Sequence, residues 1–332
     1  MISASVVIRS YNEERHIETL CRALAGQQTG HPFEVILVDS GSEDRTRSIG
    51  AAYGARICRI DPAAFTFGRS LNLGIAAARG DVVAFISAHC YPEHSRWLAE
   101  LVRPFSDPRV ALVYGRQRGA ATTKFSEHRL FERWFPEESN FEQRLPFCNN
   151  ANAAVRRAVW RESPYDETLT GLEDLAWAQS AISRGHLLAY HAGAGVIHVH
   201  DETTRQVFRR YRREAMAFAR IYPGERFSLA EFVKLLTLNV GADVAHGLRH
   251  GGLSGHVASI LSFRACQFWG TYLGYRDPGG VTPSLRERFY YPPRPRARRT
   301  AAPPARPSLS TAGGRGSGTT GLPPGPVGSV LD

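Results

Sequence analysis

Short apolar runs alternate with stretches of helical periodicity in the first part of the chain. Four runs have strand length and are nearly continuous in hydrophobicity, at residues 5–9, 34–38, 55–60 and 82–86. Helical spacing lies between them, at residues 12–28, after a predicted cap at Ser42 with Asp44 in the first turn, and at 69–79. Continuously apolar strands are typical of a parallel sheet that is covered on both faces. The alternation therefore predicts an α/β fold, with a mostly parallel central sheet and helices on both of its faces.

The pattern becomes mixed beyond residue 110. It predicts a strand at 110–114, a helix or mobile loop at 125–138, a helix at 173–184 and short strands at 187–190 and 196–199. A basic amphipathic helix is predicted at 203–220, followed by two helices within 228–275 that Gly251 and Gly252 separate. This second part predicts that the sheet continues and then gives way to helices.

We divide the chain into three parts on this basis. Residues 1–202 form the predicted α/β domain, with one half at about 1–115 and the other at about 116–202, and residues 203–290 form a helical C-terminal extension. The tail at 291–332 holds nine prolines, seven glycines and six arginines from Pro292 onward, and almost no large apolar residues. Such a segment cannot bury enough surface to offset the loss of chain entropy, so we expect it to be disordered.

Composition excludes several classes of protein. The five cysteines form no CxxC pair, which argues against a zinc ribbon and a disulfide framework. No basic stretch leads into an apolar stretch at the start, so no signal peptide is predicted, and no run of about 18 uncharged apolar residues predicts a spanning helix. Half of the net charge of +10 lies in the arginine-rich tail, whose bias we attribute to GC-rich coding. We expect a cytoplasmic protein that binds no nucleic acid.

Four polar clusters fall where the predicted sheet would gather them. They are residues 9–13 after the first strand, 39–44 after the second, 67–72 at the start of the third helix, and 87–89 after the fourth strand. Ligands of open α/β sheets bind at the carboxyl ends of the strands, where Ser10, Asp39 and Ser87 lie. Each cluster alone is also compatible with helix capping. Together they predict a ligand site at this edge.

The chain resembles the family 2 glycosyltransferases from about Ser3 to His200. The resemblance rests on Ser10-Tyr11-Asn12-Glu13, on residues 38–46 and on Gly68-Arg69-Ser70-Leu71-Asn72. It implies the Rossmann-like GT-A fold, with a donor half followed by an acceptor half. It also implies that Asp39 accepts the N3–H of uracil or thymine and that Arg69 binds the diphosphate. The donor-binding set that it implies is Arg9, Ser10, Tyr11, Glu13, Asp39, Arg69, Asn72, Ser87 and Ala88.

The chain departs from this family at the metal motif. Ser87-Ala88-His89 replaces the usual Asp-x-Asp. Neutral imidazole is a good ligand, so His89 could still bind a divalent metal, Mn²⁺ or Mg²⁺, and the loss of carboxylates favours Mn²⁺. Relatives often carry a metal-binding histidine in the strand at 196–199, which implies His198, with His200 two residues on as the alternative. His89 could instead be a plain polar residue at a strand end.

Glu173 and Asp174 resemble the catalytic Glu-Asp pair of the family. The resemblance implies that Asp174 is the general base that deprotonates the acceptor hydroxyl, and that Glu173 orients it or binds the acceptor. Without the resemblance, adjacent acids at a helix start could serve only the helix dipole. Asn150 and Asn152 match an acceptor-side segment of relatives.

These observations predict an inverting hexosyl- or N-acetylhexosaminyl-transferase that uses a UDP- or dTDP-sugar. The 67–72 segment and Pro92 are most similar to rhamnosyltransferase-type members, which implies dTDP-rhamnose, with UDP-N-acetylglucosamine or another UDP-sugar as the alternative. The acceptor could be a saccharide, a lipid-linked sugar or a small natural product. The basic and aromatic C-terminal helices could shape the acceptor site, a homodimer contact or a peripheral contact with the inner face of the membrane, or could simply form a helical bundle.

Four alternative functions differ in how well they fit the sequence. A Rossmann oxidoreductase needs GxGxxG after the first strand, and a P-loop enzyme needs GxxxxGK[ST]; the sequence has neither. A metal-dependent hydrolase built from His89, His191, His198 and His200 would leave Asp39 and Arg69 unexplained. The main alternative is a non-catalytic sugar-nucleotide-binding or scaffold protein, because the metal motif is altered.

Overall fold

A computed structural model describes residues 3–277 except 31, 251, 252 and 254, together with residues 279 and 290. The predicted disordered tail at 291–332 lies outside these described residues, as does the Gly251-Gly252 pair.

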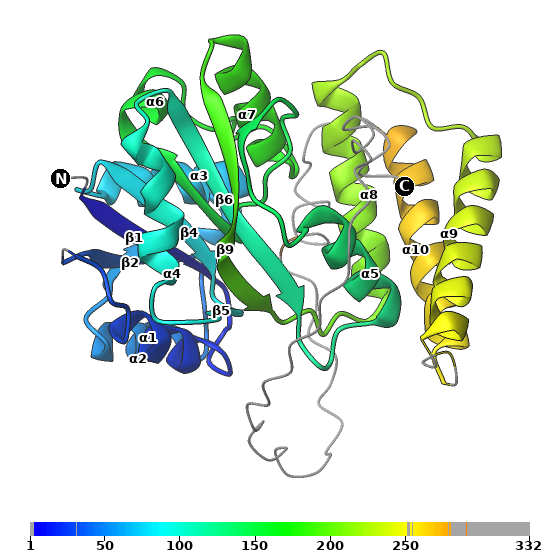
Figure 1. Ribbon diagram of the computed structural model, residues 1–332, viewed down its shortest axis with the longest axis horizontal. Helices are drawn as coiled ribbons and strands as arrows, with labels where there is room; N and C mark the ends of the chain where they lie inside the picture. The colour runs from blue at the N-terminus through cyan, green and yellow to red at the C-terminus, as the bar shows by residue number, and fades with distance from the viewer. Residues whose placement is uncertain are drawn as a thin grey trace.

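One nine-stranded sheet runs through the α/β part of the molecule (Figure 1). Its strands follow the order β3-β2-β1-β4-β8-β6-β9-β5, and β7 pairs with β9. The first four strands are β1 (Ala4–Ser10), β2 (Glu34–Asp39), β3 (Arg56–Arg59) and β4 (Val82–Ser87), and they pair in parallel. The predicted α/β class and the parallel first half are therefore confirmed.

The rest of the sheet is mixed. Its strands are β5 (Cys90–Pro92), β6 (Val110–Gly119), β7 (Asn140–Gln143), β8 (Asn152–Arg156) and β9 (Leu187–His198). Strand β8 lies antiparallel between β4 and β6, and β6 pairs in parallel with β9. The two short strands predicted at 187–190 and 196–199 are one strand, because β9 continues through an irregularity in its pairing with β6.

Helices cover both faces of the sheet, as predicted. Helices α1 (Ile17–Ala25), α2 (Thr46–Ala52) and α4 (Trp97–Val102) lie over one face, where Leu20, Leu37 and Trp97 share a core. Helices α3 (Phe67–Ala77), α6 (Arg157–Glu162) and α7 (Glu173–Ser183) lie over the other face, where Ile75, Phe85 and Trp177 share a second core. Two 3₁₀ turns, at Pro62–Ala64 and Arg103–Ser106, join elements in the first half.

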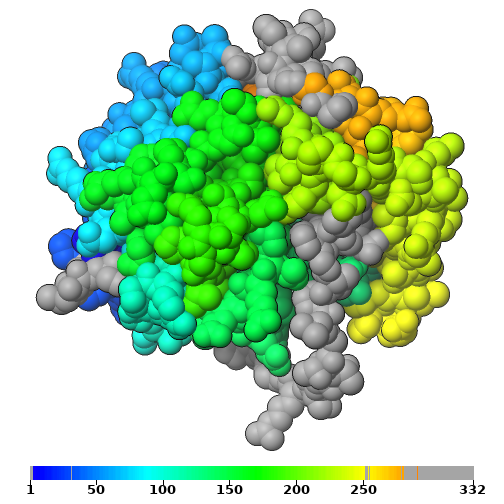
Figure 2. All heavy atoms as spheres, turned by 90° about the horizontal axis from the view of Figure 1, so that it is seen from above, coloured from blue at the N-terminus to red at the C-terminus, as the bar shows by residue number. Residues whose placement is uncertain are grey.

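A helical layer stands beside the second half of the sheet (Figures 1 and 2). It consists of α5 (Phe125–Trp134), α8 (Thr204–Ile221), α9 (Leu229–Arg249) and α10 (Val257–Tyr275). Helix α10 packs closely on α8, because a Cβ at Gly270 would come within 2.5 Å of the Phe208 carbonyl oxygen, and one at Gly274 within 2.4 Å of the Arg212 carbonyl oxygen. The segment at 125–138, left open between helix and loop, begins with helix α5. None of the helices in the described part of the chain is long and apolar enough to cross a membrane.

Candidate active site

The carboxyl ends of β1, β2 and β4 meet at one edge of the sheet. Ser10 lies opposite Asp39, and Arg9 lies opposite Ser87, in parallel register. Ser10 and Ser87 are buried, and Ala88 is fully buried with its N–H donated to the Arg9 carbonyl oxygen (3.3 Å). The structure thus brings three of the predicted polar clusters together.

Asp39 is fully buried and carries one unpartnered oxygen. Its Oδ2 accepts the backbone N–H groups of Gly41 (3.2 Å) and Ser42 (3.1 Å), and Arg47 Nε lies 3.8 Å away. Its Oδ1 is buried without a hydrogen-bond partner. A buried carboxylate oxygen with no donor is costly, so this atom is suited to accept a hydrogen bond from a ligand.

The turn after β1 is tied to the turn after β2. Asn12 has a positive φ of 56°, and its N–H is donated to Ser42 Oγ (2.8 Å), while its own Oδ1 accepts the N–H of Glu43 (2.9 Å). Ser42 therefore stabilises the turn after β1 by accepting the Asn12 N–H. It does not cap α2, which begins at Thr46 without a side-chain cap. Half-buried Tyr11 lies in the same turn. A strained residue held by such bonds is common where a site must be preorganised.

Arg9 occupies the centre of this edge. Its Nη1 lies 3.7 Å from Glu173 Oε1, which is too long for a hydrogen bond, and its guanidinium carbon lies 5.5 Å from the centre of the Phe67 ring. Its Nε and Nη1 are buried without hydrogen-bond partners. Arg9 thus offers free N–H donors between the strand ends and helix α7.

Arg69 and Asn72 both contact Glu167. Arg69 is half exposed, and its Nη1 lies 3.3 Å from Glu167 Oε2. Asn72 donates to Glu167 Oε1 (3.0 Å) and to the Tyr165 carbonyl oxygen (2.9 Å), and its Oδ1 accepts from Trp160 Nε1 (2.9 Å) and the Tyr165 N–H (3.0 Å). Arg69 can turn toward a ligand by leaving Glu167. The amide of Asn72 instead fixes α3 to the segment before α7.

Three histidines gather beside the Ser87-Ala88-His89 elbow. The rings of His89 and His198 stack with centroids 5.1 Å apart, and those of His198 and His200 lie 3.9 Å apart. Glu13 Oε1 lies 2.8 Å from His89 Nδ1. Burial disfavours protonation of His89, but the Glu13 carboxylate outweighs it and raises the pKa of His89 above its ordinary value. Burial lowers the pKa of His198 well below its ordinary value, and His200 and His89 add to this effect.

The His198–His200 pair fits a bound cation. Gln117 Oε1 lies 2.7 Å from His198 Nδ1, and Glu127 Oε1 lies 2.7 Å from His200 Nδ1, so each Nδ1 carries the proton that it donates. The two Nε2 atoms then face each other at 2.9 Å, which requires a proton or a metal ion between their lone pairs. Two nitrogen ligands at right angles on one ion, each about 2.1 Å from it, would lie about 3.0 Å apart. Such outer partners on Nδ1 are typical of metal-binding histidines.

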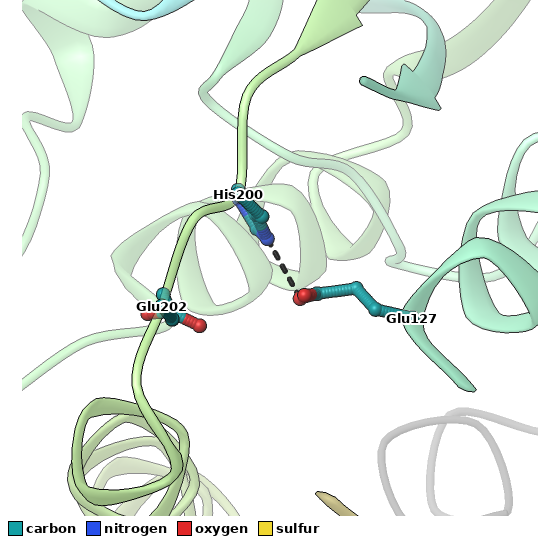
Figure 3. A group of neighbouring side chains, drawn as sticks. All are labelled: Glu127, His200 and Glu202. Carbon is teal, nitrogen blue, oxygen red and sulfur yellow. Dashed lines mark hydrogen bonds and ion pairs between the residues drawn. The ribbon is translucent and has the colours of Figure 1, made fainter. Parts of the chain in front are cut away.

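An ion-pair cluster adjoins this pair. Glu127, His200 and Glu202 bring potential ligand atoms within 4.8 Å of one another (Figure 3). Arg210 of α8 already contacts both carboxylates, with its Nη2 2.8 Å from Glu202 Oε2. Burial opposes ionisation of Glu127, but Arg210 and His200 outweigh it and lower the pKa of Glu127 to about 2. Both carboxylates already have Arg210 as an ion-pair partner, which leaves His198 and His200 as the better fit to a metal. His191 lies outside this group, against Glu100 (3.2 Å).

Glu173 and Asp174 begin helix α7. Leu172, directly before them, has a positive φ of 54°, an unusual conformation for a branched side chain. Asp174 Oδ2 accepts the N–H of Asn150 (3.1 Å), and its Oδ1 accepts the N–H of Leu175 (2.9 Å). Burial, followed by the Glu173 carboxylate, raises the pKa of Asp174 to about 7. An acid with this pKa can gain and release a proton near neutral pH.

The two predicted acceptor-side asparagines differ in position. Asn150 is buried beside Asp174, and its Nδ2 has no hydrogen-bond partner. Asn152 is fully buried: its Nδ2 donates to the carbonyl oxygens of Arg116 (3.0 Å) and Ala194 (2.7 Å), and its Oδ1 accepts from Trp97 Nε1 (2.9 Å). With its amide fully used inside the protein, Asn152 has a structural position and no free group for an acceptor.

Several residues of the site were not found from the sequence. Glu13 belongs to the predicted donor-binding set, but its contact with His89 was not predicted. Gln117, Glu127 and Glu167 orient the histidines and Asn72, and no motif marks them. Gln117 lies at a buried position of β6, beyond the strand predicted at 110–114, so no signal in the sequence marks it.

Comparison with known proteins supports the fold and the family. The family model for Glycosyl transferase family 2 matches residues 5–163. The O-antigen chain rhamnosyltransferase WbaN of Salmonella anatum is 32% identical over 197 residues, which are 56% of this chain and 62% of that protein. The O-antigen chain rhamnosyltransferase RfbN of Salmonella typhimurium is 30% identical over 223 residues, 62% of this chain and 69% of that protein. This chain thus spans less than two thirds of the first relative.

A solved structure has the same architecture. Mannosyltransferase PcManGT from Pyrobaculum calidifontis, in complex with GDP-Man and Mn²⁺, superposes with a TM-score of 0.58 over 83% of this chain and 87% of that chain, at 17% identity. At this identity the likeness concerns the fold alone, and it confirms the predicted GT-A fold. The match to RfbN, at 30% identity over more than two thirds of that protein's length, together with the family-model match, establishes that this chain belongs to glycosyltransferase family 2, in its rhamnosyltransferase-like group.

Proposed function

We propose that this protein is an inverting glycosyltransferase that moves a sugar from a UDP- or dTDP-sugar to an acceptor hydroxyl. The observation that carries the proposal is Asp174, whose raised pKa suits a general base, close to Glu173 and to the unpaired donors of Arg9. A buried acid with a raised pKa beside a second carboxylate is more typical of a catalytic site than of a site that only binds a nucleotide.

Asp39 would select the nucleobase. Uracil and thymine both present an N3–H donor, and the unpartnered Oδ1 of Asp39 is an acceptor of the right kind. Ser10 and Tyr11 would line the base and ribose beside it, with Glu13 near the ribose and at the same time bound to His89. Arg9 and Arg69 would bind the diphosphate through their N–H groups, and Ser87 and Ala88 would lie beneath it. Asn72 would support Arg69 indirectly by fixing Glu167.

His198 and His200 would hold the divalent metal, together with His89. Nitrogen ligands favour Mn²⁺ over Mg²⁺. When bound, the ion would supply positive charge to the departing diphosphate. Glu13 and Gln117 would keep the rings oriented for that task.

Asp174 would remove the acceptor proton during attack. The acceptor oxygen forms a bond to the anomeric carbon from the side opposite the diphosphate, the bond from that carbon to the diphosphate oxygen breaks, and the proton passes to an Asp174 oxygen. The configuration of that carbon is inverted. Glu173 would orient the acceptor or Asp174, and Asn150 would hold the carboxylate through its N–H.

The donor sugar is most closely suggested by the named relatives. Two O-antigen chain rhamnosyltransferases favour a rhamnosyl donor of the dTDP type, with UDP-N-acetylglucosamine or another UDP-sugar as the alternative. The acceptor would be a saccharide, a lipid-linked sugar or a small natural product. Contact with a membrane and homodimer formation stay predictions.

A donor screen by thermal shift tests nucleotide and metal together. We expect a UDP- or dTDP-sugar to raise the melting temperature of the full chain in Mn²⁺ more than in chelator, since a ligand that binds only the folded state stabilises it. In the variant His198→Asn the donor should give the same shift in Mn²⁺ and in chelator. Equal shifts in wild type with and without Mn²⁺ would contradict the metal assignment, and no shift with any donor would contradict the nucleotide site.

A further inference from the structure

Two arginines from distant parts of the chain share one aromatic ring. The guanidinium carbon of Arg213, from helix α8, lies 4.8 Å from the centre of the Phe67 ring, and that of Arg9, from strand β1, lies 5.5 Å from it. Tyr290 packs edge-on against the same ring, with centroids 5.3 Å apart. Phe67 is thus fixed in place and in turn fixes both guanidinium groups.

These guanidinium groups retain free hydrogen-bond donors. Stacking on a ring occupies the face of a guanidinium and leaves the N–H groups at its edge available. Nε of Arg213 and both Nε and Nη1 of Arg9 are buried without hydrogen-bond partners. Within the described residues Arg213 forms no ion pair, and the Glu173 carboxylate near Arg9 is too distant for a hydrogen bond. Buried donors on a charged group are costly unless an anion satisfies them.

The pair lies next to the catalytic residues. Nε of Arg213 is 3.5 Å from where a Cβ of Gly171 would be, and the Arg213 carbonyl oxygen accepts a hydrogen bond from Thr170 Oγ1 (2.9 Å). Gly171 is separated from Glu173 by Leu172 alone. Arg213 therefore borders the surface on which Asp174 would meet the acceptor.

We propose that Arg213 and Arg9, held by Phe67, form a receptor for a phosphoryl group beside the Glu173-Asp174 pair. A guanidinium fork matches phosphate oxygens in geometry and charge, and two guanidinium groups within 5.5 Å of the centre of one ring exceed the need of a neutral sugar hydroxyl. The phosphoryl group belongs either to a phosphate-bearing acceptor or to the diphosphate of the donor. The inference rests on the proposed function for the identity of the substrate, and on the structure alone for phosphate binding.

Calorimetric titration of the full chain with inorganic phosphate at low ionic strength tests the receptor. We expect wild type to bind phosphate and Arg213→Gln to weaken binding by about tenfold or more, as the loss of a charge-assisted hydrogen bond predicts. Arg205→Gln removes the same charge from an exposed position of the same helix, so it should change the affinity by less than about twofold. Arg213→Lys keeps the positive charge but lacks the paired N–H donors of the guanidinium group, so it should bind phosphate more weakly than wild type. This variant replaces Arg213→Gln in the experiment if Arg213→Gln does not fold.

Titration with inorganic phosphate in saturating UDP or dTDP distinguishes a receptor for an acceptor phosphate from a receptor for the donor diphosphate. If phosphate still binds and Arg213→Gln leaves nucleotide affinity unchanged, the receptor serves the acceptor. If the nucleotide displaces phosphate and Arg213→Gln weakens nucleotide binding, the receptor serves the donor. The proposal is overturned if both Arg213 variants bind phosphate and nucleotide with the same affinities as wild type. It is also overturned if wild type binds no phosphate and Arg213→Gln leaves nucleotide affinity unchanged. These titrations need no turnover, so a failure of the proposed transferase activity would be seen separately.

Discussion

Asp39 has one open hydrogen-bond acceptor, which we propose binds the nucleobase. Its Oδ2 is held by two backbone N–H groups and its Oδ1 is left open, so the side chain is both fixed and available. We expect Asp39→Asn to weaken UDP or dTDP binding by about tenfold to a hundredfold, the loss expected for a hydrogen bond to a charged group. Asp61→Asn is the matched control, because Asp61 also accepts a backbone N–H after the next strand but caps the Pro62–Ala64 turn. Calorimetry that finds equal affinities for the Asp39 variant and wild type would refute this nucleobase role.

The ionised Asp174 carboxylate should lower the free energy of unfolding near neutral pH. Its pKa is raised to about 7 in the folded chain, against about 3.9 for an unfolded one. The folded chain therefore binds the proton more tightly, so the contribution of this group is most favourable below about pH 4 and is lost as pH rises toward about 7. Asp174→Asn carries no charge to desolvate. Without substrate, the melting temperature of the variant relative to wild type should be about 2 °C or more higher at pH 8 than at pH 5; a constant difference across this range would argue against the raised pKa.

The sequence was informative for residues that a motif marks. Asp39, Glu173 and Asp174 could be placed because strand ends and helix starts can be located from hydrophobic periodicity. The partners of the histidines could not, because Glu13, Gln117 and Glu127 approach them only through the tertiary fold. Asn152 illustrates the opposite error, since a polar residue next to a predicted site proved to satisfy carbonyl groups in the interior.

At the scale of elements, the start of helix α3 depends on a close approach at Gly68. A Cβ there would lie 2.4 Å from the Asp166 carbonyl oxygen and 3.0 Å from the carbonyl carbon, so no side chain fits. The same segment supplies Glu167 to Arg69 and Asn72. Helix α3 is thus positioned against the loop that precedes Glu173 and Asp174.

We expect Gly68→Ala to push helix α3 away from the segment that contains Asp166 and Glu167. The substitution should lower the free energy of unfolding by about 1–3 kcal/mol, the usual cost of overpacking, and should weaken donor binding because Phe67 and Arg69 move. Denaturant unfolding and donor calorimetry measure the two effects. Gly224→Ala, at an open and exposed position, should change neither. If Gly68→Ala and wild type have equal free energies of unfolding, the close contact between residue 68 and the Asp166 carbonyl group does not limit the side chain at that position.

The parallel strands were predictable and the antiparallel ones were not. Strands β1, β2 and β4 have largely apolar runs, and these and the short β3 are separated by segments of helical periodicity, so the type of each element could be predicted. Strand β8 inserts between β4 and β6 by a long-range pairing that no local pattern records. The sequence predicts two strands in place of β9, because Gly193 and Gly195 interrupt the hydrophobic run, but the backbone of the strand continues through them.

At the scale of the whole molecule, a buried ion pair connects helices α9 and α10 of the C-terminal extension. Arg264 of α10 and Asp243 of α9 form two hydrogen bonds of 2.8 and 3.0 Å, and both side chains are almost inaccessible to solvent. Arg264 also lies 3.5 Å from the Ser126 carbonyl oxygen of α5, so it links the extension to the segment that holds Glu127. The extension therefore supports the region around the histidines.

Breaking this pair should be costly. We expect Asp243→Ala to lower the free energy of unfolding by about 3–5 kcal/mol, because Arg264 is then buried without a counter-charge. The double variant Asp243→Leu with Arg264→Met should recover much of this loss, since it leaves no buried charge. Chemical denaturation compares the three chains. A single variant as stable as wild type would mean that the pair is solvated and carries no such role.

Release of free nucleoside diphosphate from UDP- and dTDP-sugars by the purified full chain, in Mn²⁺ and with candidate acceptors, tests the transferase assignment most directly. The account predicts acceptor-dependent release by wild type, reduced by a factor of about 10² or more in Asp174→Asn at saturating donor, with donor affinity preserved. Binding of a donor without release from any of them, or near-normal turnover in Asp174→Asn, would contradict it.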